Sequence, residues 1–386
     1  MAKGTMTNGT NGWHVSFQRT IEYEVVNCHN IFDPQNDALL SSGKRENTRR
    51  FVIVDANVDK HFSEAIRDYF DFHKIDTKIL VLPAGEENKS LDNYLWILRE
   101  LDDFPINRRD EPIIAIGGGV LTDISGFVAS SYRRGVPHIK VPTTLMGYVD
   151  ASVGIKTGVN FNSHKNRLGS FEPPKKVFLD SSFLKTLPER HVLNGVCEML
   201  KLAVIKDLAL FELLELHGFA SISSSFQDEI SASILDRSVG GMLEELQPNL
   251  YEDELARKVD FGHTFSYGLE THEEAHLLHG EAVLIDILVS SILANARNLL
   301  SDQELDRLFD LVSKLGIHLN SELVTPKLLW DTLQERTYHR NGLQRVPLPK
   351  GLGQCTFVND IKFEEIQSAC KILEERKISH ESIYQY

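Results

Sequence analysis

Short apolar runs alternate with helical patterns along the first half of the chain. Five apolar runs, each ending in a turn or a polar residue, predict β-strands. They cover residues 49–58, 77–85, 111–119, 138–144 and 175–180. Between them, residues 62–74, residues 91–104 and the run after three consecutive glycines have the apolar spacing of amphipathic helices. This alternation predicts βαβ units and a mainly parallel sheet.

The pattern changes near residue 181, where apolar periodicities of helix length replace the strand signals. They cover residues 194–206, 208–218, 280–298 and 302–316. We therefore predict two domains, an α/β domain over residues 14–180 and an all-α domain over residues 181–386. The small, polar residues 1–13 predict a disordered tail.

Composition narrows the class of protein. The 42% hydrophobic and 25% charged residues are typical of a soluble chain, and no run approaches the ~18 apolar residues of a membrane span. The start has no secretion signal and the four cysteines form no CxxC pair, so we expect a cytoplasmic protein with reduced thiols. A formal net charge of -14 disfavours nucleic acid and anionic membrane as partners.

The run "IIAIGGGVLTDISG" is an apolar strand, a glycine turn and the start of a helix. Gly117, Gly118 and Gly119 would let backbone N–H groups approach a pyrophosphate at the helix N-terminus. The usual GxGxxG spacing is absent, and Asp55, the acid best placed for a ribose hydroxyl, precedes the glycines. A tight turn without a ligand therefore stays an alternative.

Polar side chains also follow several of the predicted strands. The clusters contain Glu86 and Lys89, then Thr143, Thr144, Asp150 and Lys156, and finally Lys165 and Asn166. A single cluster of this kind is usually a solvated loop. Several clusters at the carboxyl ends of neighbouring strands favour a binding site in the crevice beyond the sheet.

The second half carries candidate metal ligands. Glu198 lies in an apolar helical pattern with Lys201 one turn later, and His263 and His279 follow in "DFGHTF" and "HGEAV". One carboxylate and two histidines suit a catalytic zinc site with an open position. The residues alone leave a buried salt-bridge network equally open.

Further strings occur in a characteristic order between about residues 50 and 360. They are "GEENKS", "GGGVLTD", "GFVASSYRRG", "PTTLMGYVDASVGIKTGVN", "KNRLGSF", "FLKTLPER", "GVCEMLK", "GHTF" and "HGEAV". In this order they resemble the sugar phosphate cyclase family, whose founding member is 3-dehydroquinate synthase. The resemblance implies a Rossmann-like NAD-binding domain, a helical metal- and substrate-binding domain, and an active site between them.

The resemblance also implies a role for individual residues. Zinc, or cobalt in its place, would be held by Glu198, His263 and His279. NAD would contact Asp55, Asn57, Glu86, Lys89, Gly118, Gly119, Val120, Asp123, Thr143, Thr144, Lys156, Lys165, Phe183 and Thr186. The sugar phosphate would meet Asp150, Lys156, Asn166 and Lys201, with Arg134 reaching the phosphate from the neighbouring subunit of a homodimer.

The family chemistry is a redox-neutral cyclisation. Transient oxidation by NAD acidifies a C–H bond, phosphate leaves by β-elimination, the hydride returns, the ring opens and an intramolecular aldol closes a carbocycle.

Departures from the founding member point to the substrate. By ungapped counting, Met242 and Ala256 replace the lysine and arginine that read a carboxylate, although Arg257 is adjacent to the second position. Asp260 stands where the founding member has an asparagine. The combination of this aspartate with His339 resembles the 2-epi-5-epi-valiolone synthase branch of the family, which cyclises sedoheptulose 7-phosphate. Both side chains could hydrogen-bond substrate hydroxyls. A helix N-cap for Asp260 and a surface histidine for His339 are the plainer interpretations.

Several other activities stay open on the sequence. Desmethyl-4-deoxygadusol synthase and another valiolone epimer synthase would use the same substrate. 3-Dehydroquinate synthase and 2-deoxy-scyllo-inosose synthase would use other sugar phosphates. A metal-dependent polyol dehydrogenase would not need the phosphate-binding lysines, and a sugar phosphate sensor without activity would not need complete metal and nucleotide sets.

Overall fold

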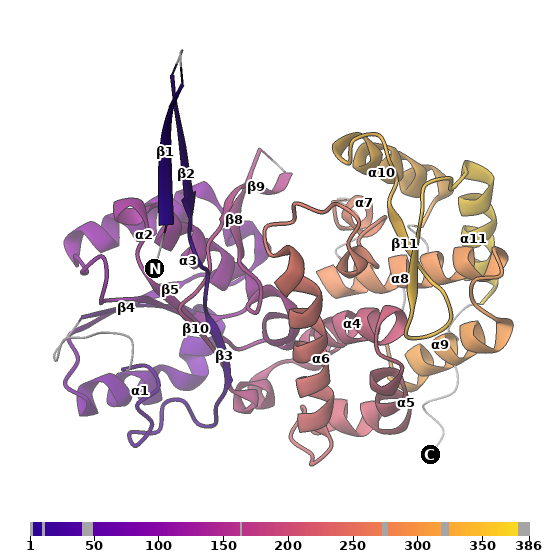
Figure 1. The fold of residues 1–386 in the computed structure, drawn as a ribbon. Coiled ribbons are helices and arrows are strands. Elements are labelled where there is room, and N and C mark those ends of the chain that lie inside the picture. The colour runs from indigo at the N-terminus through magenta and orange to yellow at the C-terminus, as the bar shows by residue number, and fades with distance from the viewer. Residues whose placement is uncertain are drawn as a thin grey trace.

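A six-stranded parallel sheet forms the N-terminal part of the protein (Figure 1). The computed structural model describes residues 3–9, 12–40, 49–162, 164–271, 277–317 and 324–376. The sheet order is β3-β10-β7-β6-β4-β5. The strands are β3 (Glu24–Asn27), β4 (Arg50–Asp55), β5 (Thr77–Leu82), β6 (Ile113–Gly117), β7 (His138–Pro142) and β10 (Lys176–Leu179).

Helices cover both faces of this sheet (Figure 1). Phe51 and Ile53 of β4 pack into a core with α2 (Leu91–Asp103) and α3 (Gly119–Ser131). Val52 and Val54 pack into a second core with α1 (Ala56–Phe72). Successive side chains of a strand point to opposite faces, so a strand covered on both sides needs an unbroken apolar run. The predicted α/β class and parallel sheet are therefore confirmed, and β3 is a strand that the sequence pattern did not reveal.

Shorter elements connect the strands and helices of the N-terminal part. An antiparallel hairpin, β8 (Lys156–Phe161) and β9 (His164–Phe171), packs against α3. The short helical segments are η1 (Glu86–Asn88), η2 (Tyr132–Arg134), η3 (Gly147–Ala151) and η4 (Ser181–Thr186). Because its side chains are mostly polar, the hairpin carries no core-facing alternation that the sequence could reveal.

The C-terminal part is built mainly from helices. They are α4 (Glu189–Ile205), α5 (Leu208–Ser223), α6 (Ser231–Leu246), α7 (Ser266–Glu270), α8 (His279–Ala296), α9 (Asp302–Lys314), α10 (Pro326–His339) and α11 (Phe363–Glu375), with single turns η5 (Gln247–Asn249) and η6 (Lys258–Asp260). The all-α prediction needs one correction, because β11 (Val346–Pro349) and β12 (Cys355–Val358) pair antiparallel beside α8. The boundary at residue 181 stays a prediction, although the last strand of the sheet ends at Leu179.

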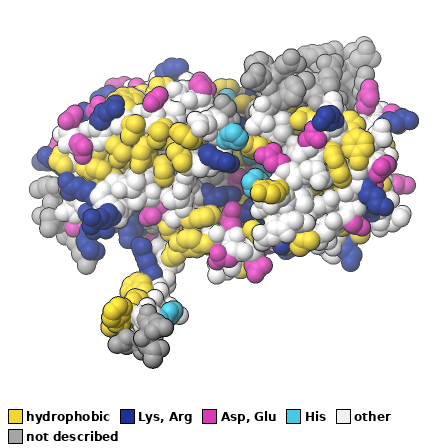
Figure 2. Space-filling view, turned by 90° about the horizontal axis from the view of Figure 1, so that it is seen from above, with side chains coloured by type: hydrophobic (Ala, Val, Ile, Leu, Met, Phe, Trp, Pro, Cys, Tyr) yellow, Lys and Arg dark blue, Asp and Glu magenta, His cyan; other side chains and the backbone are white. Residues whose placement is uncertain are grey.

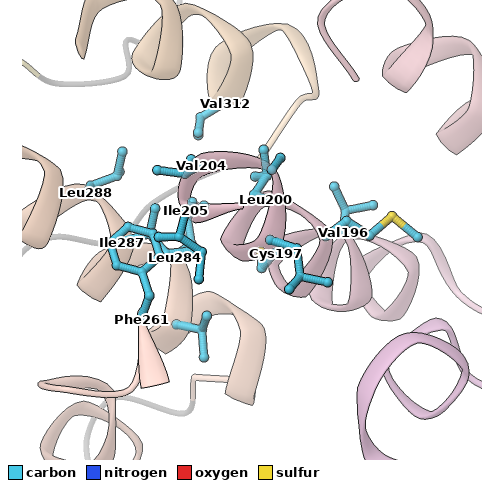
Figure 3. Packing of buried hydrophobic residues seen from close by; sticks show 14 of the residues in the cluster. Val196, Cys197, Leu200, Val204, Ile205, Phe261, Leu284, Ile287, Leu288 and Val312 are labelled. Carbon is cyan, nitrogen blue, oxygen red and sulfur yellow. The ribbon is translucent and has the colours of Figure 1, made fainter. Parts of the chain in front are cut away.

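Helices α4 and α8 form the centre of the C-terminal core. Figure 3 shows their apolar side chains packed together, among them Val196, Cys197, Leu200, Val204, Leu284, Ile287 and Leu288. Of the helices that the structure describes, α8 alone has the length and composition of a membrane span, and 78% of that window is buried inside the protein. Burial all round is typical of a core helix, so the apolar run is explained by packing.

The N-terminus differs from the predicted disordered tail. β1 (Lys3–Gly9) and β2 (Gly12–Gln18) pair antiparallel, and the hairpin projects away from the body of the protein (Figure 1). Thr, Trp, Val and Phe favour strands, and this preference outweighs the polar composition of the segment. Residues 1, 2, 10 and 11 of the predicted tail, and residues 377–386 of the predicted helical domain, lie outside the described residues.

Candidate active site

A cleft of about 1180 Å³ lies between the two parts of the protein and is lined from both. Figure 2 shows basic, acidic and histidine side chains gathered in the hollow between the two halves. The N-terminal wall comes from the carboxyl ends of β4, β6 and β7 and from the β8–β9 hairpin. The opposite wall comes from α4 and from the segments that lead into α7 and α8. The crevice predicted beyond the parallel strands is therefore present.

The glycine turn brings backbone close to the cleft. A Cβ on Gly118 would lie 2.9 Å from Thr144 Cγ2, and a Cβ on Gly119 would lie 3.1 Å from Ala151 Cβ. Larger residues would push the turn outward, so both glycines keep the N-terminus of α3 open to a ligand. The surrounding wall contains the other strand-end residues predicted for NAD, namely Asp55, Asn57, Val120, Thr143 and Thr144. Asp55 also caps α1, because its carboxylate accepts from the Asn57 backbone N–H at 2.8 Å.

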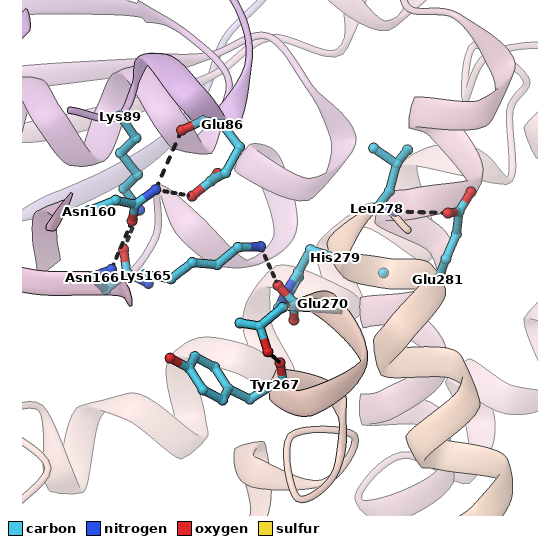
Figure 4. Close-up of polar contacts among 12 residues, drawn as sticks. Glu86, Lys89, Asn160, Lys165, Asn166, Tyr267, Glu270, Leu278, His279 and Glu281 are labelled. Atoms are coloured by element: carbon cyan, nitrogen blue, oxygen red, sulfur yellow. Dashed lines mark hydrogen bonds and ion pairs between the residues drawn. The ribbon is translucent and has the colours of Figure 1, made fainter. Parts of the chain in front are cut away.

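Lys89 holds the hairpin against this wall. Its Nζ donates to Asp123 Oδ2 at 2.7 Å and to Asn166 Oδ1. Burial lowers the pKa of Lys89, but Asp123 and Glu86 outweigh burial and raise it, so the ammonium stays charged. On the same hairpin, Asn160 donates to Glu86 Oε1 at 2.8 Å (Figure 4). The N-terminal wall is thus a connected network of polar side chains.

Glu198, His263 and His279 form the candidate metal centre. Their ligand atoms all lie within 4.8 Å of one another. Glu198 is fully buried on α4, and its Oε1 lies 3.2 Å from His279 Nε2 and 3.7 Å from His263 Nε2. The other ring nitrogen of each histidine is also engaged, His263 Nδ1 with the Phe261 carbonyl at 3.2 Å and His279 Nδ1 with Glu270 at 2.8 Å. Such outer contacts fix the ring orientation and tautomer of zinc-binding histidines.

Charge in this centre favours a cation. Burial acts to lower the pKa of His279, but the carboxylates of Glu198 and Glu270 outweigh it and raise the pKa to about 10. Burial and Lys201 lower the pKa of His263 to about 3, so its imidazole is neutral and free to coordinate. The donor set of one carboxylate and two imidazoles fits zinc or cobalt.

Two further charged groups adjoin Glu198. Lys201 is 2% exposed and contacts Glu198 Oε2, one turn away on α4. Burial lowers the pKa of Lys201, whereas Glu198 and Asp150 raise it by a larger amount. Burial also raises the pKa of Asp150, against the opposing effect of Lys201. The structure therefore places two of the predicted substrate-binding residues next to the candidate metal centre.

Asp260 sits in a cage of arginines. Its carboxylate lies 2.6 Å from Arg257 Nη2, 2.7 Å from Arg340 Nη2 and 3.2 Å from Arg336 Nη2. Burial acts to raise the pKa of Asp260, but the arginines outweigh it and lower the pKa to about 2. Arg257 also contacts Glu252, whose Oε1 lies 2.9 Å from Lys156 Nζ. Asp260 lines the cleft as an ionised carboxylate, and it does not serve as a helix N-cap.

The structure brings most of the predicted residues to the cleft and leaves five outside its lining, one of which is the fully buried Glu198 beside His263 and His279. Arg257 is directed at Asp260 and Glu252. Phe183 is buried against Phe62, 5.0 Å between ring centroids, whereas the nearby Thr186 lines the cleft. Arg134 lies in the turn after α3, and His339 is an exposed residue at the end of α10. Contacts of Arg134 or His339 with a substrate stay predictions.

Sequence reasoning missed two carboxylates of the cleft, Glu252 and Glu270. Glu252 lies in the loop after η5 with a backbone φ of 59°, and Glu270 is the last residue of α7. Glu270 follows His263 by only seven residues in "GHTFSYGLE", and this closeness to a candidate metal ligand was the one sequence feature that pointed to it. Its contact with His279 depends on the fold of the intervening chain, so the sequence could not identify the partner.

Comparison with known proteins shows which family the chain is similar to. The chain matches the 3-dehydroquinate synthase N-terminal model over residues 79–194 and the C-terminal model over residues 195–337. A 2-epi-5-epi-valiolone synthase from Streptomyces albus is 47% identical over 372 residues, which are 94% of this chain and 91% of that protein. A demethyl-4-deoxygadusol synthase from Trichormus variabilis is 37% identical over 92% of this chain and 88% of its own length.

A solved structure matches as well. ValA, a 2-epi-5-epi-valiolone synthase from Streptomyces hygroscopicus subsp. jinggangensis, was determined with NAD+ and Zn2+ bound. It superposes with a TM-score of 0.90 at 42% identity and covers 95% of this chain and 100% of its own.

Proposed function

The chain belongs to the 3-dehydroquinate synthase family of sugar phosphate cyclases, and from this premise we propose that it converts sedoheptulose 7-phosphate into 2-epi-5-epi-valiolone and inorganic phosphate. The enzyme is a lyase that uses NAD catalytically, with zinc, or cobalt in its place, as the metal. The observation that carries the proposal is a single cleft. In it a glycine turn faces Glu198, His263 and His279 across space lined by lysines.

The bound cofactors would supply the redox chemistry and a Lewis acid, as NAD accepts and returns a hydride and zinc polarises a substrate hydroxyl. The remaining work falls to the side chains of this chain. Glu198 and the two histidines would hold the metal, and the wall from Asp55 to Thr144 would hold the dinucleotide. The full burial of Glu198 and its contacts with both histidines support the metal assignment, and the cleft position of the strand-end residues supports the dinucleotide assignment.

Binding of the phosphate is assigned to Lys156, Asn166 and Lys201. All three line the cleft, and the raised pKa of Lys201 keeps its ammonium charged toward a dianionic leaving group. Lys156 is paired with Glu252. A bound phosphate group would displace this carboxylate from the lysine or share the lysine with it. We further propose that Arg134 reaches the phosphate of the neighbouring subunit in a homodimer, since in its own subunit it lies outside the cleft lining.

Asp260 supports the choice of substrate. It presents an ionised carboxylate to the cleft, and the apolar side chain of Met242 lines the same wall. A substrate carboxylate at this point would meet the negative charge of Asp260, and the three arginines beside Asp260 are already paired with it and lie outside the cleft lining. Sugar hydroxyls, in contrast, can donate to Asp260. The site therefore favours sedoheptulose 7-phosphate over a carboxylated heptulosonate phosphate. We further propose that the enzyme acts on this substrate in the cytoplasm.

The decisive experiment supplies sedoheptulose 7-phosphate with catalytic NAD and zinc, and follows phosphate release, absorbance of NADH and the NMR spectrum of the product. We expect one phosphate per cyclitol and no net NADH. Accumulating NADH would indicate a polyol dehydrogenase instead, and turnover of only a carboxylated heptulosonate phosphate would indicate 3-dehydroquinate synthase.

The NMR spectrum also separates the remaining cyclases. Another valiolone epimer would differ in stereochemistry, and demethyl-4-deoxygadusol would show the loss of a water. Turnover of glucose 6-phosphate would indicate 2-deoxy-scyllo-inosose synthase. Binding of the sugar phosphate without any product would indicate a sensor.

A further inference from the structure

Glu270 joins the candidate metal centre to the opposite wall of the cleft. Its Oε1 accepts from His279 Nδ1 at 2.8 Å, and its Oε2 accepts from Lys165 Nζ at 2.7 Å (Figure 4). The Glu270 side chain is only 7% exposed, whereas those of its partners Lys165 and His279 are partly buried. A single buried carboxylate thus touches a candidate metal ligand on one side and the N-terminal wall on the other.

Lys165 belongs to the β8–β9 hairpin, which is fixed to the nucleotide side of the cleft. The next residue, Asn166, accepts from Lys89, and Lys89 also donates to Asp123 on the helix that begins at the glycine turn. On β8, Asn160 donates to Glu86 after β5. Short polar contacts therefore connect the glycine-turn wall to the hairpin that carries Lys165.

Two other contacts join the hairpin to the C-terminal part, Lys156 with Glu252 at 2.9 Å and the ring of Phe171 with Tyr251 at 5.6 Å. Neither Glu252 nor Tyr251 contacts a metal ligand in the part of the chain that the structure describes. Among these contacts, only that of Lys165 with Glu270 leads through one side chain to His279. Among the contacts of the hairpin, it therefore links the two halves of the site most directly.

We propose that Glu270 is a positioning residue that orients His279 for the metal and, through Lys165, makes the binding of NAD and of the metal mutually reinforcing. The inference rests on the proposed use of NAD and zinc. A carboxylate on the far nitrogen of a metal-binding histidine fixes the ring and increases its basicity. A dinucleotide that holds the hairpin in place would keep Lys165 on Glu270, so the metal meets a preset ligand, and linkage makes the effect reciprocal.

The test measures Co2+ affinity by competition with a chelator, and the visible Co2+ absorption spectrum, with no NAD and with saturating NAD. The variants are Glu270→Leu, Glu270→Gln and Lys165→Met, with Lys371→Met as a control. Lys371 also pairs with a glutamate, Glu375, but both side chains lie exposed on α11 and neither lines the cleft.

For Glu270→Leu we expect Co2+ affinity to fall about 10- to 100-fold, with an altered absorption spectrum. Glu270→Gln should lie between Glu270→Leu and the wild type, because its amide oxygen can still accept from His279 Nδ1. In the wild type, NAD should strengthen Co2+ binding by about fivefold or more. In Lys165→Met the ratio of Co2+ affinity with saturating NAD to that without NAD should approach one. In Lys371→Met this ratio should stay at the wild-type value.

Unchanged Co2+ affinity and spectrum in Glu270→Leu would overturn the positioning role. A wild type whose Co2+ affinity does not respond to NAD, or a Lys165→Met variant that keeps the full response, would overturn the coupling. Failure of the proposed function has a different outcome, because the wild type itself would then bind no metal or release no phosphate from sedoheptulose 7-phosphate.

Discussion

Replacement of Asp260 by asparagine should destabilise the protein substantially while preserving the shape of the side chain. Asp260 is 5% exposed and is the shared partner of Arg257, Arg336 and Arg340. The arginines lower its pKa from 3.8 to about 2, which corresponds to about 2.4 kcal/mol of stability at neutral pH. Removal of the charge also leaves three close guanidinium groups with less compensation, and breaking such buried pairs costs about 3–5 kcal/mol. We expect a loss of about 2–4 kcal/mol.

The measurement is urea unfolding of wild type and Asp260→Asn, followed by circular dichroism at several pH values. A carboxyl group with a lowered pKa stabilises the folded state fully above its unfolded pKa of about 3.9, and this contribution disappears as the pH falls toward the folded pKa. The difference between the two proteins should therefore be constant from pH 7.5 to about 5 and shrink below about pH 4.

The matched control is Asp331→Asn, because Asp331 is paired with Lys327 but is 57% exposed. An exposed ion pair contributes about 0–1 kcal/mol. If Asp260→Asn were no less stable at pH 7.5 than Asp331→Asn, the electrostatic account of the arginine cage would be refuted.

Three further outcomes follow from the site. His263→Ala should lose both stoichiometric zinc and turnover, as measured by metal analysis and phosphate release, and full activity in a metal-free variant would exclude the ligand role. Removal of zinc from the wild type by a chelator should abolish turnover, and Co2+ should restore it. The midpoint of thermal unfolding should stay within a few degrees of that of the zinc-bound protein, because the apolar cores of both halves form without the metal. Gly118→Ala should weaken NAD binding at least tenfold in a fluorescence titration, because the new Cβ would lie 2.9 Å from Thr144 Cγ2. The control Gly240→Ala should bind NAD normally, because nothing lies within 4 Å of its new Cβ. Equal NAD affinity of the two variants would contradict the role of the glycine turn.

The sequence was informative where one local pattern determines the outcome. The strands at residues 49–58 and 111–119 were found because double-sided burial needs unbroken apolar runs, and the structure places β4 and β6 within them. Glu198 was found because an acid in an apolar helical pattern needs a partner. The N-terminal hairpin was missed, since its polar composition concealed its pairing.

Contacts between distant segments could not be predicted in this way. Asp260 is paired with Arg257, three residues earlier, and with Arg336 in α10 and Arg340 just after it, more than seventy residues later. No spacing rule connects positions that far apart, so the sequence suggested a hydroxyl-binding carboxylate and not a cage. Glu252 and Glu270 were missed for the same reason, because their importance comes from partners that only the fold brings near.

The arginine cage also constrains how this enzyme could diverge. Asp260 balances charge for three guanidinium groups at once, so a change of substrate by mutation at this position alone would pass through a poorly folded intermediate. Loss of Arg340 or Arg336 first would lower that barrier, since fewer cations would then depend on the carboxylate. Relatives that bind a different sugar at this part of the cleft should therefore differ at Asp260 and at one of its arginines together. Laboratory evolution of a new substrate range should likewise recover such paired substitutions before single ones.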